Sequence, residues 1–292
     1  MSENWTVIKL LDWASPYLEK YGITTPRLDA ELLLARVLSC DRIDLYLNYD
    51  QPTSATERAV FKKLLIRRRE REPIAYILGE KEFWSLPFRV NSKVLIPRPE
   101  TEHLVEAAIT IINQYYPAGG TVVDLGAGSG NILLSIAHHF QAHAGLNWLG
   151  FDLSPKAVEV ASKNARRLKL ERVAFSVADL AEVRPDPGQN WDIILSNPPY
   201  IPTAELKKLA GEVRREPQRA LDGGPDGLDY YRILSQRISS LLPDGGFLIV
   251  EVGDGQAGKV KALLVEQNPH SLDTVLDLQG IERVVVGQWI KS

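Results

Sequence analysis

Cysteine is almost absent from this chain of 292 residues, which contains only Cys40. A single cysteine cannot form an intramolecular disulfide and cannot hold a zinc ion with other cysteines, which is typical of a reducing compartment, so we expect a cytoplasmic protein. An excess of charge of one sign is also lacking, because 34 Lys and Arg face 37 Asp and Glu, a net charge of −3. No overall positive field favours nucleic acid or an anionic membrane, and we expect neither as a direct partner.

Long apolar runs are missing as well. The longest stretch without Asp, Glu, Lys or Arg, residues 125–151, is interrupted by glycines, an asparagine and three histidines, so it is not a membrane span. The N-terminus carries Glu3 and Asp12 and lacks the apolar segment of a signal peptide, so we expect no export. The composition, 45% hydrophobic and 24% charged, is that of a globular protein, and the length suggests about two domains.

The first part of the chain, residues 1–73, has apolar side chains at helical spacing. Ser54 and Glu57 form the sequence pattern of a capping box at the start of one helix. We therefore predict a small helical bundle and interpret it as a docking domain. The mostly basic run from Arg67 to Arg71 is either a solvated helix face or a surface for an acidic or RNA-bound partner, and both interpretations stay open.

The pattern changes after the helical part. Residues 74–96 show alternating apolar positions interrupted by glycine and proline, which predicts a linking β-hairpin. In residues 97–292 strand and helix patterns alternate, which predicts an α/β domain with a mostly parallel, doubly wound sheet. The last two predicted strands are separated only by residues 279–282, too few for a crossover helix, so an antiparallel C-terminal hairpin is expected.

A glycine-rich turn, Gly126 to Gly130, links a predicted strand directly to a helix. Glycines there allow a ligand to lie against the backbone at a helix N-terminus, where N–H groups and the helix dipole attract polar groups. The dinucleotide fingerprint requires glycine or alanine at position 131, which is Asn131, so hydride chemistry loses support. The remaining pattern, Asp-x-Gly-x-Gly-x-Gly from Asp124, resembles the first motif of class I S-adenosylmethionine-dependent methyltransferases. A tight turn without a ligand is the alternative.

Two further acidic residues follow predicted strands. Asp152 ends the second strand, where a carboxylate can accept both hydrogen bonds of a ribose diol, although it could be only the helix cap before Pro155. Asp179 follows the third strand, where methyltransferases of this superfamily contact adenine, and it is equally interpretable as a turn residue. Together the two positions predict a nucleoside site at the strand ends.

The most specific signal is the sequence Asn197, Pro198, Pro199, Tyr200 after the fourth strand of the predicted sheet. An amide nitrogen is a poor nucleophile because its lone pair is delocalised, so an enzyme must orient it and accept its hydrogens. The Asn197 side-chain oxygen and the Pro198 carbonyl can do this because the prolines stiffen the loop, and Tyr200 offers an aromatic face. An ordinary strand-to-loop turn is the bland alternative.

These motifs together resemble one family, the HemK-type release factor glutamine methyltransferases, over roughly Pro26 to Gly287. The residues that carry the resemblance are Pro73 to Gly79, Phe83, Ile96 to Glu102, Asp152, Ser154, Ala157, Asn164, Glu216, Pro217, Ala220, Leu221, Gly224, Asp226 to Leu228, Glu251, Gly253 and Gln256.

The resemblance implies site residues. It implies that the cofactor is bound by Asp124, Gly126, Ala127, Gly128, Gly130, Asp152, Asp179 and Asn197. It implies that the substrate is bound by Asn197, Pro198, Pro199, Tyr200, Arg98 and Glu100, with Asn197, Pro198 and Tyr200 catalytic. Arg98 is equally interpretable as a structural clamp. Ala127 and Leu180 depart from the family pattern, and Leu180 weakens the expectation of stacking against adenine.

The implied activity is methyl transfer from S-adenosyl-L-methionine to the N5 side-chain nitrogen of the glutamine in the Gly-Gly-Gln motif of class I peptide chain release factors. S-adenosyl-L-homocysteine is the other product, no metal takes part, and translation termination is modulated. The open alternatives are glutamine methylation of a large-subunit ribosomal protein, adenine N6 methylation of nucleic acid, and a scaffold without turnover. Residues 201–227 are interpreted as a candidate substrate lid.

Overall fold

The structure is a computed structural model that describes residues 5–290. Glu3 and the outermost residues of the two terminal predicted domains therefore lie outside the described part. The chain forms two compact units: residues 1–79 with 210–215, and residues 80–209 with 216–292. None of the helices within residues 5–290 is both long and apolar enough to span a bilayer.

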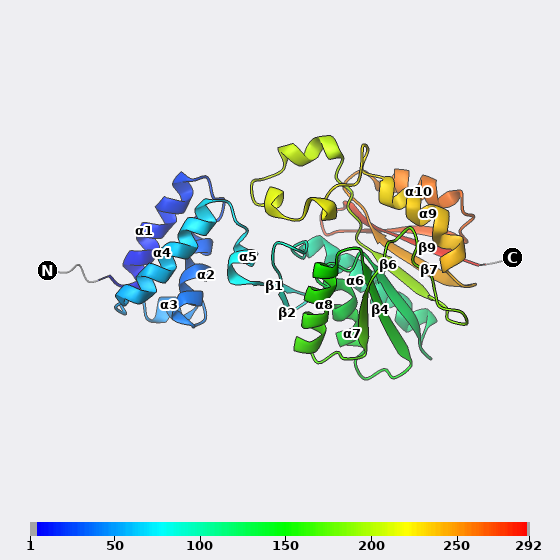
Figure 1. The fold of residues 1–292 in the computed structure, drawn as a ribbon, viewed down its shortest axis with the longest axis horizontal. Helices are drawn as coiled ribbons and strands as arrows, with labels where there is room; N and C mark the ends of the chain where they lie inside the picture. The colour runs from blue at the N-terminus through cyan, green and yellow to red at the C-terminus, as the bar shows by residue number, and fades with distance from the viewer. Residues whose placement is uncertain (1–4, 291–292) are drawn as a thin grey trace. The chain divides into compact units, whose positions relative to one another are not determined.

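The first unit is helical, as predicted (blue and cyan in Figure 1). Its helices are α1 (Val7–Lys20), α2 (Pro26–Leu38), α3 (Asp44–Leu47), α4 (Ala55–Arg69) and α5 (Ile74–Leu78), with η3 (Val213–Arg215) from the later segment. The predicted capping box opens α4, because the Ser54 side chain accepts from the N–H of Glu57 at 3.2 Å and Glu57 accepts from the N–H of Ser54 at 2.6 Å. Leu33, Leu34 and Phe61 lie in the core of this unit.

The predicted hairpin is confirmed, but over a shorter range. Its antiparallel strands are β1 (Glu80–Phe83) and β2 (Leu86–Arg89). Residues 74–78 form helix α5 instead of strand, because Pro73 starts the turn and Gly79, with φ of 78°, ends it in the left-handed conformation. The apolar spacing in this short segment buries Ile77 among the other helices of the first unit, which alternation alone did not predict.

The second unit contains the predicted doubly wound sheet. Its strands are β3 (Gly120–Leu125), β4 (Leu146–Asp152), β5 (Val173–Val177), β6 (Ile193–Ser196), β7 (Gly246–Glu251), β8 (Ser271–Leu276) and β9 (Glu282–Trp289). Its helices are η1 (Pro99–Thr101), α6 (Glu102–Tyr115), α7 (Asn131–His139), α8 (Pro155–Arg167), η2 (Thr203–Lys208), η4 (Gln218–Ala220), α9 (Asp229–Leu241) and α10 (Ala257–Val265). The strand order is β5-β4-β3-β6-β7-β9-β8, and β9 is antiparallel to both neighbours, which confirms the C-terminal hairpin.

Successive residues of the strands point to opposite faces of the sheet and pack in two apolar cores, one on each face. Val122 and Ile193 pack with α6 and α7 on one face, while Val123 and Ile194 pack with α9 and α10 on the other. Figure 1 shows where these helices lie about the sheet. The chain winds outward from β3 in one direction and from β6 in the other. Loops that follow β3 and β6 therefore meet at the carboxyl edge of the sheet, where open α/β sheets bind ligands.

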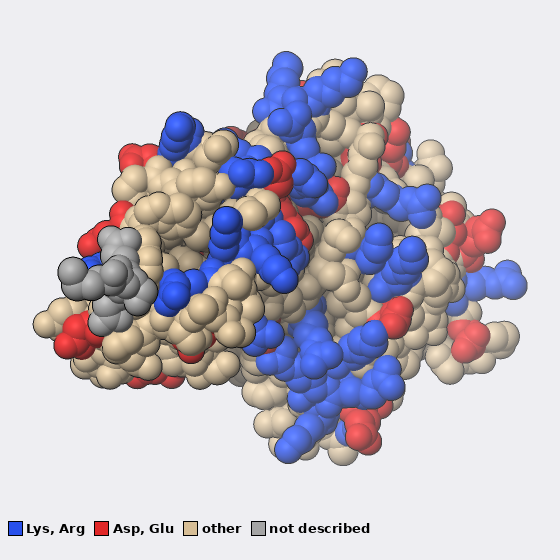
Figure 2. All heavy atoms as spheres, turned by 60° about the vertical axis from the view of Figure 1, so that its left-hand side comes forward, with Lys and Arg blue, Asp and Glu red and all other residues tan. Residues whose placement is uncertain are grey.

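The basic run at the end of α4 is largely paired inside its own unit. Arg67 pairs with Glu72 and Arg69 with Glu70, while Arg68 is buried against Asp29 and Glu212. The face drawn in Figure 2 carries many Lys and Arg side chains, with Asp and Glu between them. Pairing within the unit favours a structural role for this run, and its contact with a substrate stays a prediction.

Candidate active site

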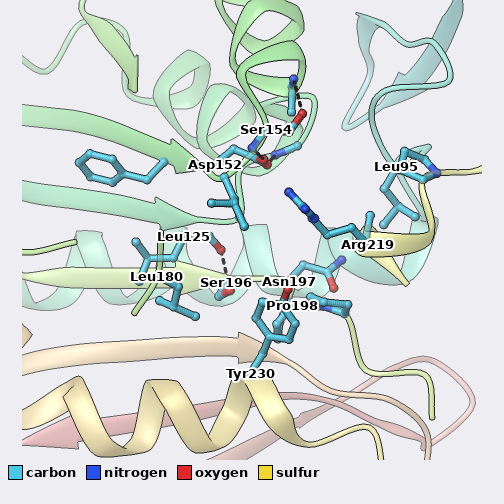
Figure 3. A pocket seen from close by; sticks show the side chains of 18 of the residues that line it. Leu95, Leu125, Asp152, Ser154, Leu180, Ser196, Asn197, Pro198, Arg219 and Tyr230 are labelled. Atoms are coloured by element: carbon cyan, nitrogen blue, oxygen red, sulfur yellow. Dashed lines mark hydrogen bonds between the residues drawn. The ribbon is translucent and has the colours of Figure 1, made fainter. Parts of the chain in front are cut away.

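A cavity of about 560 Å³ lies in the second unit at the carboxyl ends of β3, β4 and β6. Its walls come from the glycine turn after β3, the end of β4, the segment after β5, the tetrapeptide after β6 and residues 217–220 (Figure 3). Apolar side chains dominate the lining, with a few polar groups between them, which is the usual composition of a small-molecule site. The topology thus brings together motifs that are far apart in the sequence.

The glycine turn exposes backbone to this cavity. Gly126 and Gly128 both line it and have φ of 84° and 56°, a conformation that other residues rarely adopt. A Cβ added to Gly126 would meet no atom within 4 Å, so a ligand can approach the main chain there. Gly130 has a different role, because a Cβ there would lie 2.9 Å from the ring of Phe175. Ala127 and Gly130 are both buried and lie outside the cavity lining, so their contact with a cofactor stays a prediction.

Asp152 joins the glycine turn to the end of β4. Its Oδ2 accepts a hydrogen bond from the N–H of Gly128 at 2.8 Å, and its Oδ1 accepts one from the N–H of Ser154 at 2.8 Å. Burial raises the pKa of this carboxyl, while the two N–H groups and the charge of Arg219 oppose the rise. Ser154 caps α8 by accepting from Ala157, so Asp152 is not needed as the cap and its remaining lone pairs can serve a ligand.

Asp124 lies beneath the glycine turn and is fully buried. Neither carboxyl oxygen has a hydrogen-bond partner within residues 5–290. Burial and the nearby charge of Asp152 raise the pKa of Asp124 to about 7, and the N–H of Leu133 only partly offsets them. A carboxyl left unpaired at this depth is costly. Asp124 lies outside the residues that line the cavity, so its contact with a cofactor stays a prediction.

Asp179 and Leu180 form the wall next to β5. Both line the cavity, and the Oδ1 of Asp179 accepts from the N–H of Ala181 at 2.8 Å, as in a turn. Sequence reasoning did not identify Tyr230 of α9, which also lines this region (Figure 3). The wall thus combines one carboxyl with apolar and aromatic surface, which is suited to a planar base.

The tetrapeptide places Asn197, Pro198 and Pro199 on the cavity. The Oγ of Ser196 donates to the carbonyl oxygen of Leu125 at 2.6 Å, which ties the end of β6 to the end of β3. The Nδ2 of Asn197 donates to the Oγ1 of Thr101 at 3.2 Å, so its Oδ1 is left as an acceptor.

Tyr200, the last residue of the tetrapeptide, lies outside the residues that line the cavity. Its ring packs on the apolar core beside α9 and α10, and burial raises the pKa of its hydroxyl. Its carbonyl oxygen accepts from the Nε2 of Gln256 at 2.9 Å. In the structure this residue therefore fixes the loop, and contact of its ring with a substrate stays a prediction.

Arg98 forms an ion pair with Glu216, which is 6% exposed and also accepts from the N–H of Ile96 at 3.0 Å. This contact has the geometry of the clamp interpretation. Arg98 and Glu100 both lie outside the cavity lining, so their contact with a substrate also stays a prediction.

Arg219 is a site residue that sequence reasoning missed. It extends from residues 217–220 toward Asp152 (Figure 3). Burial raises the pKa values of Asp152 and Tyr230, and the charge of Arg219 opposes that rise at both. The flanking Pro217 and Ala220 were part of the family pattern, but only the fold brings this side chain to the cavity.

The two ends of the candidate lid, residues 201–227, are hydrogen-bonded to each other. The N–H of Gly223 donates to the carbonyl oxygen of Ile201 at 2.9 Å, and the N–H of Thr203 donates to that of Gly224 at 2.9 Å. Its middle, residues 210–215, belongs to the helical unit, and Pro217, Arg219 and Ala220 line the cavity. Movement of this segment stays a prediction.

Comparison with known proteins is consistent with this geometry. The family described as PrmC N-terminal domain matches residues 9–79, and the family described as methyltransferase domain matches residues 117–279. The release factor glutamine methyltransferase of Geobacter sulfurreducens is 43% identical over 287 residues, which cover 98% of each chain. The protein of the same name from Rhodopirellula baltica is 40% identical, over 96% of this chain and 95% of that one.

A solved structure shares the fold at low sequence identity. The hMettl16 catalytic domain, in complex with MAT2A 3'UTR hairpin 6, has a TM-score of 0.54 at 12% identity, over 84% of this chain and 86% of that one. This likeness concerns the arrangement of strands and helices alone.

Proposed function

Because the chain belongs to the family of release factor glutamine methyltransferases, we propose that it methylates the side-chain amide nitrogen of a glutamine in a release factor. The proposed acceptor is the glutamine of the Gly-Gly-Gln loop of a class I peptide chain release factor, and the proposed place of action is the cytoplasm. The observation that carries the proposal is Asn197 at the cavity, with its NH₂ group engaged by Thr101 and its Oδ1 free to accept.

The residues around the cavity fit S-adenosylmethionine. Asp152 retains acceptor capacity for a ribose diol, and Leu180 and Tyr230 offer apolar and aromatic surface for adenine. The open backbone at Gly126 suits the polar methionine part, and the negative charge that Asp124 can carry behind the cavity wall would favour its positive charge. When bound there, S-adenosylmethionine would supply a methyl group on a positively charged sulfur.

The part of this chain in the reaction is to orient the acceptor. The Oδ1 of Asn197 and the carbonyl of Pro198 would accept the two hydrogens of the glutamine amide and direct its nitrogen lone pair at the methyl carbon. The bound cofactor would supply the methyl group and its sulfur would keep the electron pair of the broken carbon–sulfur bond, while the newly methylated amide nitrogen would lose one proton to solvent. Positioning and removal from water supply the rate, without a covalent enzyme intermediate.

The direct test is a transfer assay with S-adenosylmethionine labelled in its methyl group. A purified class I release factor should gain label, and a copy whose loop glutamine is replaced by alanine should not. Label on both proteins would exclude that glutamine as the acceptor. Label on neither, with cofactor binding retained, would contradict the substrate; ribosomal proteins and nucleic acid would then be tested as acceptors.

A further inference from the structure

The carboxyl of Glu251 is an unexplained charge beside the candidate active site. Glu251 ends β7, is only 2% exposed, and has no salt-bridge partner within residues 5–290. Its Oε2 also has no hydrogen-bond partner in that part of the chain. A buried carboxyl with one unsatisfied oxygen costs folding free energy, which raises the question of what this carboxyl does.

The sheet places this carboxyl next to the tetrapeptide. β6 and β7 are parallel neighbours, and Ser196 is paired with Val250. The residues that follow this pair, Asn197 and Glu251, therefore lie opposite each other. Hydrogen bonds from the Asn197 amide and the Thr101 hydroxyl favour the charged form of Glu251, while burial opposes it. The side chains of Thr101, Asn197 and Glu251 therefore meet at this edge of the cavity.

When Glu251 is ionised, the donors and acceptors in this cluster have one consistent direction. The carboxylate then only accepts, so Thr101 directs its hydroxyl hydrogen to Glu251 and keeps its oxygen lone pairs for the Nδ2 of Asn197 at 3.2 Å. The second hydrogen of that Nδ2 is attracted to Glu251 as well. If the Asn197 amide turned over, its Oδ1 would face the carboxylate and lose both bonds.

We propose that Glu251 and Thr101 are positioning residues that hold the Asn197 side chain with Oδ1 toward the cavity, where it accepts from the substrate amide. The assignment rests on the proposed function for its role in catalysis. The orientation itself follows from the side-chain cluster. Thr101 is 1% exposed and sits at the end of η1, so the cluster is held from two sides and keeps its geometry before substrate binds.

The test uses the full chain with Thr101→Val, which removes the hydroxyl at nearly constant volume, and Thr101→Ser, which restores it. Thr101→Val should lower kcat by about 10- to 100-fold, with KM for the release factor and Kd for S-adenosylhomocysteine within about twofold of wild type. Thr101→Ser should recover kcat to within about threefold. Glu251→Gln should also lower kcat, because a side-chain amide can present its NH₂ group to Asn197 in place of an oxygen.

A double-mutant cycle separates positioning from general loosening of the fold. In the Asn197→Ala background, adding Thr101→Val should cause no further loss of methylation rate. Because these rates are low, they are measured as single turnovers followed to long times. Full kcat in Thr101→Val, equal loss in Thr101→Ser, or an undiminished second loss in the Asn197→Ala background would each overturn the proposal.

Hydrogen exchange of the Asn197 side-chain NH₂ group can be measured without any methyl transfer, so it tests this proposal separately from the proposed function. The side-chain NH₂ signals of Asn197 in ¹⁵N-labelled protein, assigned by their disappearance in Asn197→Ala, should exchange slowly in wild type and at least tenfold faster in Thr101→Val. If wild type methylates no release factor but shows this protection, the proposed function fails and the orientation stands. If the NH₂ hydrogens exchange equally fast in both proteins, the positioning cluster is contradicted whatever the activity.

Discussion

The Oδ2 atom of Asp152 lies 2.8 Å from the backbone nitrogen of Gly128, so the end of β4 and the glycine turn after β3 form one hydrogen-bonded unit. The same carboxyl also holds the N–H of Ser154 at the start of α8. One partly buried side chain thus organises the cavity edge and, in the proposed function, the ribose of the cofactor.

Replacing Asp152 with alanine is expected to weaken cofactor binding. The variant loses the ribose acceptor and the hydrogen bond that orders Gly128, so Kd for S-adenosylhomocysteine should rise by about 10- to 100-fold, as two charge-assisted hydrogen bonds would imply. Isothermal titration calorimetry measures this change. Asp273→Ala, an exposed carboxyl on β8, is the matched control and should bind as wild type does. Equal Kd values in all three proteins would contradict this part of the account.

Replacing Asn197 with alanine should separate binding from transfer. The proposed cofactor contacts on Asp152 and Gly126 remain, so Kd for S-adenosylhomocysteine should change by less than about threefold, while kcat falls by at least about 100-fold. The comparison protein is Asn147→Ala, an exposed position on β4. Full methylation by Asn197→Ala would remove this residue from the mechanism.

The two glycines of the turn should fail in different ways. In Gly130→Ala the new Cβ meets Phe175 at 2.9 Å and φ of 78° is strained, so the free energy of unfolding should fall by about 1–3 kcal/mol. In Gly126→Ala the Cβ enters open space beside the cavity. The affinity for S-adenosylhomocysteine should therefore fall, while the free energy of unfolding should change less than in Gly130→Ala. Urea unfolding and calorimetry on both variants check this, and identical behaviour of the two would contradict the distinct roles.

Asp124 makes the stability of the protein depend on pH. Its pKa in the folded protein is raised to about 7, above its ordinary value of 3.8, so the stability it contributes is complete below the unfolded-state pKa and is lost as pH rises through the folded-state value. Asp124→Asn removes this loss. The variant should be more stable than wild type at about pH 8, by on the order of 3 kcal/mol, and nearly equal to it at about pH 4.5.

Urea unfolding at the two pH values measures that difference. Glu251, whose pKa is also raised to about 7 by burial, keeps a pH dependence in both proteins, so the comparison is made between them at each pH. A variant that is less stable than wild type at about pH 8 would show that the Asp124 carboxylate is favourably paired in the fold.

The fold was predictable because its signals are local. Apolar runs at Gly120–Leu125 and Ile193–Ser196 bury both faces of central strands, and residues 279–282 are too short for anything but a hairpin. The cavity edge was predictable for a related reason: strand ends in a doubly wound sheet meet at one edge, so Asp152 and Asn197 had to lie near each other.

What the sequence could not predict depends on contacts between distant segments. Residues 210–215 join the helical unit because Glu212 pairs with Arg68, which is buried beside Asp29, and no local pattern reports such a pairing. Thr101 lies within the family motif Ile96 to Glu102, but the sequence assigned it no role. Only the hydrogen bond to Asn197 in the structure gives it one. Helix α5 also depends on tertiary burial, here of Ile77.

The most direct measurement is the mass-spectrometric location of the methyl group on a release factor that was produced without this activity and then incubated with the protein and S-adenosylmethionine. The account predicts one added methyl, on the side-chain nitrogen of the glutamine in the Gly-Gly-Gln loop, present after incubation with wild type and absent with Asn197→Ala. A methyl group at any other residue, or equal methylation by Asn197→Ala, would contradict it.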